Sequence, residues 1–275
     1  MAGELLQYSG LITKTRAMQK RLLKKEDFER ITEFQTVQET IEFLKAQESY
    51  GRIYGGREEI KHRGQVEALI YNSILEDYQK LYHFGNKQQR EAMKLYLPQL
   101  RYKESNTRIE ISYFVEVWKK IEKFSGKQMQ QVLQEAFGTQ IDWLNIMWMY
   151  RGKQFFHQKP KEMESMLIPV HYKLKKIELQ RLLTLEHMEE FQKILSNTVY
   201  FKGREALVKI QDEISYHQVM QKMYQCLCRK YPSSMALIFY YFYEKEREIE
   251  RLTTALEGIR YQVPAKDIRE LILGL

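Results

Sequence analysis

Proline, glycine and cysteine are all scarce in this chain, and each shortage excludes a class of structure. The 275 residues include only five prolines and 13 glycines, so few positions force a turn or interrupt a helix. Leu, Glu, Lys, Gln, Arg and Met are abundant, and all of them favour helices. We therefore expect an all-α protein in which few breaks separate long helices.

The low cysteine content argues against a disulfide framework. The two cysteines, Cys226 and Cys228, lie two residues apart, and side chains at that spacing on a helix do not face each other. No histidine lies at ligand spacing from them, so no metal site is indicated. The pattern is typical of reduced cysteines in a cytosolic protein, and we expect no cofactor.

Long apolar runs are also missing. The longest, Met235–Tyr243, is much shorter than the about 20 residues that a membrane span needs. Residues 1–21 contain no continuous apolar core of signal-peptide length. We expect no segment to enter a bilayer, so attachment to a membrane would have to go through a partner.

Charge of one sign is not concentrated anywhere, although the chain carries a net charge of +8. Most basic residues stand beside acidic ones, as in Glu244–Arg251. Ordinary solvated surface is the main interpretation of this excess. A basic helical scaffold that binds nucleic acid is the alternative.

Motifs of known chemistry are absent from the sequence. Gly126-Lys127 and Gly152-Lys153 lack the earlier glycine of a Walker loop and the Ser or Thr that should follow it. The patterns G-x-G-x-x-G, G-x-S-x-G and H-E-x-x-H do not occur. The six histidines are scattered, which is typical of surface or structural residues: His62, His83, His157, His171, His187 and His217. The sequence therefore gives no positive sign of an enzyme, although an enzyme with an unrecognised site remains an alternative.

Helix signals cover most of the chain. Apolar spacing predicts helices over residues 4–22, 66–82, 87–97, 109–123, 128–136, 139–156 and 232–259. Residues 109–123 also fit a strand by alternation, but the helix is favoured. Thr36 and Glu39 form a capping-box pattern that opens another helix. Pro98 is expected to end one helix and Gly138 to separate two.

The segment after Pro232 shows the clearest pattern. Two series recur at a spacing of seven, with one polar member, over about 25 residues. They are Met235, Phe242, Ile249 and Leu256, and Ile238, Lys245, Leu252 and Ile259. A long internal helix packed in its own domain is the main interpretation, and a dimeric coiled coil is the alternative.

An aromatic-rich stretch spans Trp143–Phe156. With the basic residues Arg151 and Lys153 it fits a platform for stacking nucleic-acid bases. Trp, Met and Leu at helical spacing are more typical of core, and that interpretation is favoured. Asp142, Asn145 and Arg151 would then form the polar boundary of a buried helix.

Two parts of the chain have a second copy. Residues 24–44 return at 175–195 with five identities, namely Lys24, Lys25, Arg30, Glu39 and Leu44 opposite Lys175, Lys176, Arg181, Glu190 and Leu195. A slip of one residue sets Tyr50 opposite Tyr200. Ile141–Asn145 resembles Ile249–Thr253, and residues 160–163 parallel 264–268. A repeated helical unit usually builds a binding or scaffolding surface.

Several ordered blocks resemble one known family. Residues 142–156 (DWLNIMWMYRGKQFF) and 165–183 (SMLIPVHYKLKKIELQRLL) resemble the central signature of the V-type ATPase C-subunit family, whose eukaryotic members are called the d subunit. Residues 8–31, 47–54 and 244–272 resemble its opening, a Thr-x-Tyr segment and its closing helix. The resemblance spans nearly the whole chain.

The resemblance implies a fold and a role. Members are all-helical, with three similar modules about a pseudo-threefold axis that form a funnel or socket. They are non-catalytic and sit peripherally on the cytoplasmic face of the membrane. There they couple a central axle, built from the D and F subunits, to the membrane proteolipid ring, for ATP-linked H⁺ or Na⁺ transport. We place the modules at residues 1–105, 106–165 and 166–275.

The resemblance also guides the expected contact residues. The pattern around Asn145–Arg151 recurs around Arg251–Arg260. We therefore expect the helices there to line the axis, with Asn145, Arg151, Arg251 and Arg260 in contact with the axle or the ring. No nucleic acid is expected as a partner under this interpretation.

Overall fold

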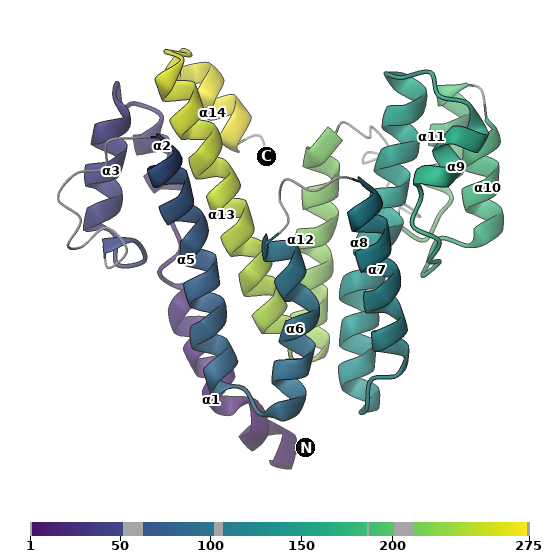
Figure 1. The fold of residues 1–275 in the computed structure, drawn as a ribbon, viewed down its shortest axis with the longest axis horizontal. Coiled ribbons are helices and arrows are strands. Elements are labelled where there is room, and N and C mark those ends of the chain that lie inside the picture. The colour runs from purple at the N-terminus through teal and green to yellow at the C-terminus, as the bar shows by residue number, and fades with distance from the viewer. Residues whose placement is uncertain (1, 52–62, 102–106, 186, 201–211, 274–275) are drawn as a thin grey trace. The chain divides into compact units, whose positions relative to one another are not determined.

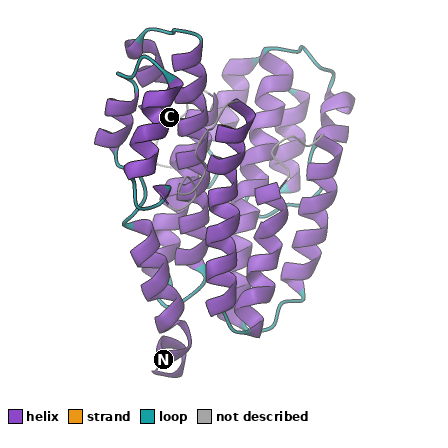
Figure 2. Cartoon of the chain, turned by 60° about the vertical axis from the view of Figure 1, so that its left-hand side comes forward, coloured by secondary structure: helices purple, strands orange, loops and turns teal. Residues whose placement is uncertain are grey.

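The computed structural model describes residues 2–51, 63–101, 107–185, 187–200 and 212–273. Within these ranges every regular element is an α-helix and none is a strand (Figure 2), which confirms the all-α prediction. The chain forms two compact units: unit 1 is Met1–Arg101 with Leu237–Leu275, and unit 2 is Tyr102–Ala236. The pseudo-threefold arrangement and the three modules stay predictions, and the boundary at 105–106 lies outside the described residues.

Unit 1 combines helices from both ends of the chain. Its N-terminal part contains α1 (Ala2–Gln19), α2 (Lys25–Ile31), α3 (Val37–Ala46), α5 (Arg63–Phe84) and α6 (Lys87–Arg101). Its C-terminal part contains α13 (Ala236–Arg260) and α14 (Ala265–Leu273). Helix α5 packs on α1 and α6, and α14 packs on α2, so the earliest and the latest helices share this unit (Figure 1).

Unit 2 is built from consecutive helices. These are α7 (Thr107–Glu122), α8 (Lys127–Gln154), α9 (Pro160–Met166), α10 (Lys176–Thr184), α11 (Met188–Ser196) and α12 (Asp212–Lys230). Helix α8 packs against α7, α9 and α12, and α10 packs against α9 and α11. Neither Cys226 nor Cys228 on α12 is part of a disulfide.

Local signals in the sequence explain several helix starts. The hydroxyl of Thr36 accepts the N–H of Glu39 at 3.3 Å, so the predicted cap of α3 is confirmed. In both copies of the repeat the first helix, α2 or α10, begins with a hydrogen bond from a backbone N–H to the carboxylate three residues later. The backbone N–H of Lys24 binds the Asp27 carboxylate at 2.7 Å, and that of Lys175 binds Glu178 at 2.8 Å.

Two predicted helix breaks are wrong. Helix α6 continues through Pro98 to Arg101, where Tyr96 and Leu100 are buried on either side of the proline. Helix α8 continues through Gly138, where close packing leaves no room for a side chain. A Cβ atom at this position would lie 2.4 Å from Cγ of Tyr172. The glycine thus permits a close approach of another segment and does not end the helix.

The long C-terminal helix follows its sequence pattern. Every member of both seven-residue series is buried, including Lys245. Phe242 lies 5.5 Å from Tyr96 and 5.8 Å from Tyr78, measured between ring centres, inside unit 1. The interpretation of an internal helix is confirmed.

Candidate functional site

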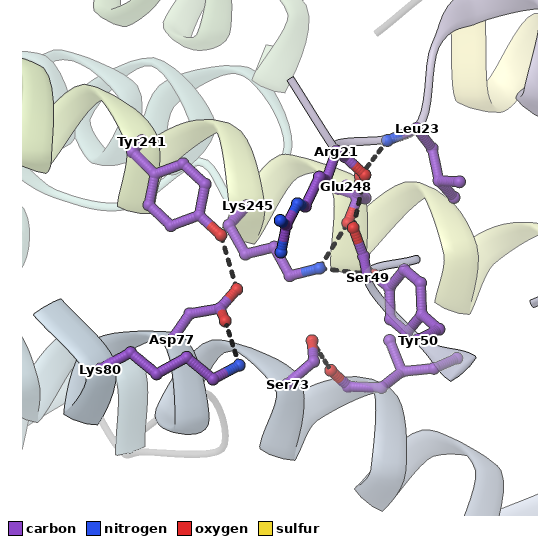
Figure 3. Close-up of polar contacts among 11 residues, drawn as sticks. Arg21, Leu23, Ser49, Tyr50, Ser73, Asp77, Lys80, Tyr241, Lys245 and Glu248 are labelled. Carbon is purple, nitrogen blue, oxygen red and sulfur yellow. Dashed lines mark hydrogen bonds and ion pairs between the residues drawn. The ribbon is translucent and has the colours of Figure 1, made fainter. Parts of the chain in front are cut away.

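A buried carboxylate on α13 joins the two ends of the α2–α3 hairpin. Leu23, which precedes α2, donates its backbone N–H to Glu248 Oε2 at 2.5 Å. Tyr50, which follows α3, donates its hydroxyl to Glu248 Oε1 at 2.7 Å. We call these three residues and Lys245 the Glu248 clasp (Figure 3). One carboxylate thereby fixes the start and the finish of the hairpin to α13.

The counter-ion of Glu248 lies on the same helix. Lys245 Nζ is 2.5 Å from Glu248 Oε1 and 2.9 Å from the Tyr50 hydroxyl oxygen, and it stands 4.1 Å from the centre of the Tyr50 ring. The side chains of Lys245 and Glu248 are only 1% and 3% exposed. Burial, and then the charge of Glu248, raises the pKa of Tyr50 well above its usual value. Removing either ion would leave the other charge buried and uncompensated.

A second buried carboxylate, Asp142 on α8, holds the α10–α11 hairpin in the same way. Its Oδ2 accepts the N–H of Leu174, before α10, at 2.9 Å and the hydroxyl of Tyr200, after α11, at 2.6 Å. The N–H groups of Tyr172 and Lys173 add bonds at 3.3 and 2.7 Å. Burial raises the pKa of Asp142, and these donors oppose that rise. We call these five residues the Asp142 clasp.

The two clasps occupy equivalent positions of the repeat. Leu23 and Leu174 immediately precede the matched residues Lys24 and Lys175. Tyr50 and Tyr200, the pair that the sequence set opposite each other, supply the two hydroxyl groups. The duplication inferred from residues 24–44 and 175–195 therefore extends to hydrogen-bonded contacts.

The matching of the two long helices needs a correction of two residues. The sequence pattern matched Asp142 to Glu250, whereas the residue that binds the hairpin is Glu248. Glu250 instead pairs with Arg247 one turn away, at 3.2 Å, and is partly exposed. Every second residue of α13 from Glu244 to Glu250 is a glutamate, so the sequence pattern alone could not tell Glu248 from Glu250.

The two long helices end in similar turns, although the closing hydrogen bond spans six residues after α8 and five after α13. His157 after α8 has φ 47° and Gln262 after α13 has φ 54°, a left-handed conformation that most residues avoid. The residue after each donates its N–H back to the carbonyl of Gly152 or Gly258, both at 2.9 Å. These turns direct the chain from each long helix into the following short helix.

The short helices α9 and α14 pack against these two glycines. A Cβ atom at Gly152 would lie 3.0 Å from Sδ of Met163, and one at Gly258 would lie 2.7 Å from Cγ1 of Ile268. Met163 and Ile268 are themselves buried. The predicted parallel between residues 160–163 and 264–268 is confirmed.

Of the expected contact residues, Asn145 is buried and Arg251 is partly buried within their own units. Asn145 is fully buried, and its amide donates to the Ile168 carbonyl at 2.9 Å and accepts the Ile168 N–H at 2.8 Å. The guanidinium of Arg251 lies 5.7 Å from the centre of the Phe28 ring, and burial, followed by the charge of Arg247, lowers its pKa. Their contact with an axle or ring stays a prediction.

The other two lie near the ends of the long helices. Arg151 is half-buried in the last turn of α8, and Arg260 is exposed at the end of α13, 5.4 Å from the centre of the Tyr261 ring. Large aromatic side chains follow both. Phe155 and Phe156 are 57% and 70% exposed, and Tyr261 is 66% exposed. Each unit thus presents an exposed aromatic side chain beside an arginine-bearing helix end.

Most of the aromatic-rich stretch is core. Trp143, Ile146, Met147 and Met149 are buried in the core of unit 2, so the favoured interpretation is confirmed. The surface available for stacking is restricted to its end, at Phe155 and Phe156. No observation here favours a nucleic-acid partner.

Two features are absent from the residues that the structure describes. Among them, no group of three His, Cys, Asp or Glu side chains is arranged to hold a metal ion. In the same ranges, no helix has both the length and the apolar character needed to cross a membrane. What the arrangement does is fasten each helical hairpin to a long helix through one carboxylate.

Sequence reasoning missed both clasps. It paired Tyr50 with Tyr200 but assigned no partner to either, and it treated Asp142 as the edge of a buried helix. A usable signal was present. Asp142 is an acidic residue within a stretch of large apolar side chains, and burial of such a residue requires several donors.

Comparison with known proteins identifies a family. The family described as "ATP synthase (C/AC39) subunit" matches residues 11–106 and 104–271. These two matches cover most of the chain. A search among curated proteins found no match.

Proposed function

Because the chain belongs to the ATP synthase (C/AC39) subunit family, we propose that it is a non-catalytic central-rotor component of a V-type ATPase. In this role it is the socket that couples the axle, built from the D and F subunits, to the membrane proteolipid ring, for ATP-linked H⁺ or Na⁺ transport. The family match over residues 11–106 and 104–271 is the observation that carries the proposal.

The internal construction of each unit suits a part that transmits torque. Such a part must resist deformation, and close-packed interiors have low compressibility. Each unit has a long helix of 25 or 28 residues with a short helix packed against a glycine near its end. A buried carboxylate then fixes a second hairpin to that helix. These features support stiffness within each unit.

The proposed location is peripheral, on the cytoplasmic face of the membrane. The chain would be held there by the ring and the axle. This part of the proposal rests on the family, whose members are described as ATP synthase subunits.

Co-purification tests the assignment directly. The full chain is expressed with the D and F subunits and the membrane ring, and each is recovered through a tag on this chain. We expect both the axle components and the ring to be retained. Failure to retain any of them, with a chain that is folded by circular dichroism, would overturn the assignment.

We further propose that the arginine-bearing helix ends contact the axle or the ring. Arg151 and Arg260 lie beside exposed aromatic side chains, and interface hot spots are enriched in aromatic residues and arginine. Charge reversal at Arg151 and Arg260 should weaken capture of the D–F axle or of the ring by at least tenfold. The matched control is Arg229→Glu, an exposed arginine on α12. Undiminished capture of both partners by a folded Arg151→Glu/Arg260→Glu variant would contradict this surface.

A further inference from the structure

The two clasps close units that differ in connectivity. In unit 2 the long helix α8 is followed directly by α9, α10 and α11. In unit 1 the corresponding hairpin α2–α3 lies at the beginning of the chain, and α13 and α14 lie at its end. Nine residues after α9 lead into the α10–α11 hairpin, whereas the α2–α3 hairpin follows α1 after residues 20–24 and is distant in sequence from α13 and α14. Gln19, at the end of α1, donates its amide N–H to Glu244 on α13 at 2.5 Å.

Further polar contacts hold the segment that leads into the hairpin of unit 2. Besides the Asp142 clasp, the Tyr172 hydroxyl donates to the Glu135 carboxylate at 2.8 Å, and Lys173 forms an ion pair with the same carboxylate. Two hydrogen bonds between Asn145 and the backbone of Ile168 fix the segment that leads into α10. Helix α8 thus supplies three polar side chains to this joint.

The α2–α3 hairpin of unit 1 is closed upon itself. Ser49, next to Tyr50, donates its hydroxyl to the carbonyl of Arg21. The Arg21 guanidinium also forms an ion pair with Glu48 at 2.9 Å. Figure 3 shows both ends of the hairpin meeting beside Glu248. Because its ends are bonded to each other, residues 21–50 can move as one body.

We propose that the Glu248 clasp is a latch, at which residues 21–50 detach from α13 and α14 in a local opening that leaves unit 2 intact. On opening, Lys245 and Glu248 stay paired on α13 and regain water, which offsets part of the loss of their bonds to Leu23 and Tyr50. The Asp142 clasp is a fixed joint by comparison, because the Glu135 and Asn145 contacts keep its hairpin in place. The latch is a property of this chain and does not depend on the proposed partners.

Such an opening must also separate the contacts that α2 makes with α13 and α14, among them the Arg251 guanidinium, 5.7 Å from the centre of the Phe28 ring. Helix α14 packs on α2, where Phe28 and Ile31 are buried. The ion pair between Arg269 and Glu33, at 3.4 Å, is exposed and therefore weak. Helices α2 and α3, of seven and ten residues, are too short to stay helical alone in water. Their backbone amides would exchange with solvent whenever the hairpin detaches.

Hydrogen exchange of the full chain, followed by mass spectrometry at several low urea concentrations, tests the latch. We expect residues 25–46 to exchange at least tenfold faster than residues 176–196, after correction for intrinsic rates. Their exchange should also depend less on urea than that of α8, because a local opening exposes little surface. Equal protection of the two hairpins, with the urea dependence of global unfolding, would overturn the proposal.

Two variants connect the opening to the clasp. Glu248→Gln should accelerate exchange over residues 25–46 by about tenfold and leave residues 176–196 unchanged. Tyr50→Phe removes one hydroxyl and leaves the ring in place, and it should accelerate exchange over residues 25–46 about fivefold. This second variant provides the test if Glu248→Gln does not fold. The matched control is Tyr200→Phe, which should leave residues 25–46 unchanged. If neither folded variant changes exchange over 25–46, the clasp is not the latch.

Discussion

At the residue scale, the buried charges of Glu248 and Asp142 are compensated in different ways. Glu248 has a buried lysine as counter-ion, at 2.5 Å. Asp142 is stabilised instead by three backbone N–H groups and one phenol. A charge without hydrogen-bond partners would not remain buried, so both solutions satisfy the carboxylate before apolar packing covers it.

Asp142→Asn should destabilise unit 2. Asparagine keeps one acceptor oxygen, whereas the carboxylate accepts four hydrogen bonds, and the new NH₂ group would face donors. We expect the free energy of unfolding to fall by about 1–3 kcal/mol. Urea unfolding followed by tryptophan fluorescence measures this. An unchanged midpoint would show that the bonds to Asp142 contribute nothing.

The same variant should alter the pH dependence of stability. Burial raises the pKa of Asp142 in the folded chain above the about 3.9 of an unfolded aspartate. Between these two values the folded state binds more protons, so the contribution of Asp142 to stability falls as pH rises through that window. The deficit of Asp142→Asn relative to the natural chain should therefore be largest near the bottom of the window and shrink as pH rises. Unfolding curves of both proteins at several pH values check this, and a deficit that grows with pH would contradict a raised pKa.

Gly138→Ala should be destabilising although alanine favours helices. The added methyl would lie 2.4 Å from Cγ of Tyr172, whose backbone N–H and hydroxyl are both bonded to α8. We expect a loss of about 1–3 kcal/mol in the free energy of unfolding. Gly10→Ala on α1 is the control, because no atom lies within 4 Å of its new methyl, and it should stabilise by up to about 1 kcal/mol. Thermal melts of the two variants should shift in opposite directions.

At the element scale, local signals predicted the helices, and distant contacts decided where they continue. The cap at Thr36 and the course of α13 follow from neighbours in the sequence, and both are confirmed. The predicted break at Gly138 was wrong because this glycine is required by the close approach of Tyr172, a residue beyond the end of α8, and not by a turn. The clasps were out of reach for the same reason. Leu23 and Glu248 are 225 residues apart, and no pattern in either segment names the other.

The ends of the long helices carry a removable strain. His157 and Gln262 adopt positive φ values of 47° and 54°, which cost an L-residue about 1 kcal/mol relative to glycine. His157→Gly and Gln262→Gly should each raise the free energy of unfolding by about 0.5–1 kcal/mol. Gln158→Gly, one residue beyond the strained position, should lower it. Thermal unfolding of the three variants checks this, and a loss of stability on Gln262→Gly would show that its side chain contributes more than the strain costs.

At the scale of the whole molecule, the two units have separate interiors that respond to different probes. The sequence contains three tryptophans, Trp118, Trp143 and Trp148, and all lie in unit 2. Tryptophan fluorescence therefore reports on unit 2, whereas far-ultraviolet circular dichroism reports on the helices of both units. Unit 1 depends on segments from both ends of the chain, so its stability should be the more sensitive to changes near the C-terminus.

Ile268→Ala and Met163→Ala form a matched pair that tests whether the units unfold separately. Each removes a buried side chain that packs on the glycine near the end of a long helix, in unit 1 and unit 2 respectively. Each should cost about 2–5 kcal/mol in its own unit. With separate unfolding, Ile268→Ala lowers the urea midpoint by circular dichroism and leaves the fluorescence midpoint unchanged, while Met163→Ala lowers the fluorescence midpoint. Equal shifts of both signals in both variants would instead show one cooperative transition, because the loss in either interior would then be felt by the whole chain.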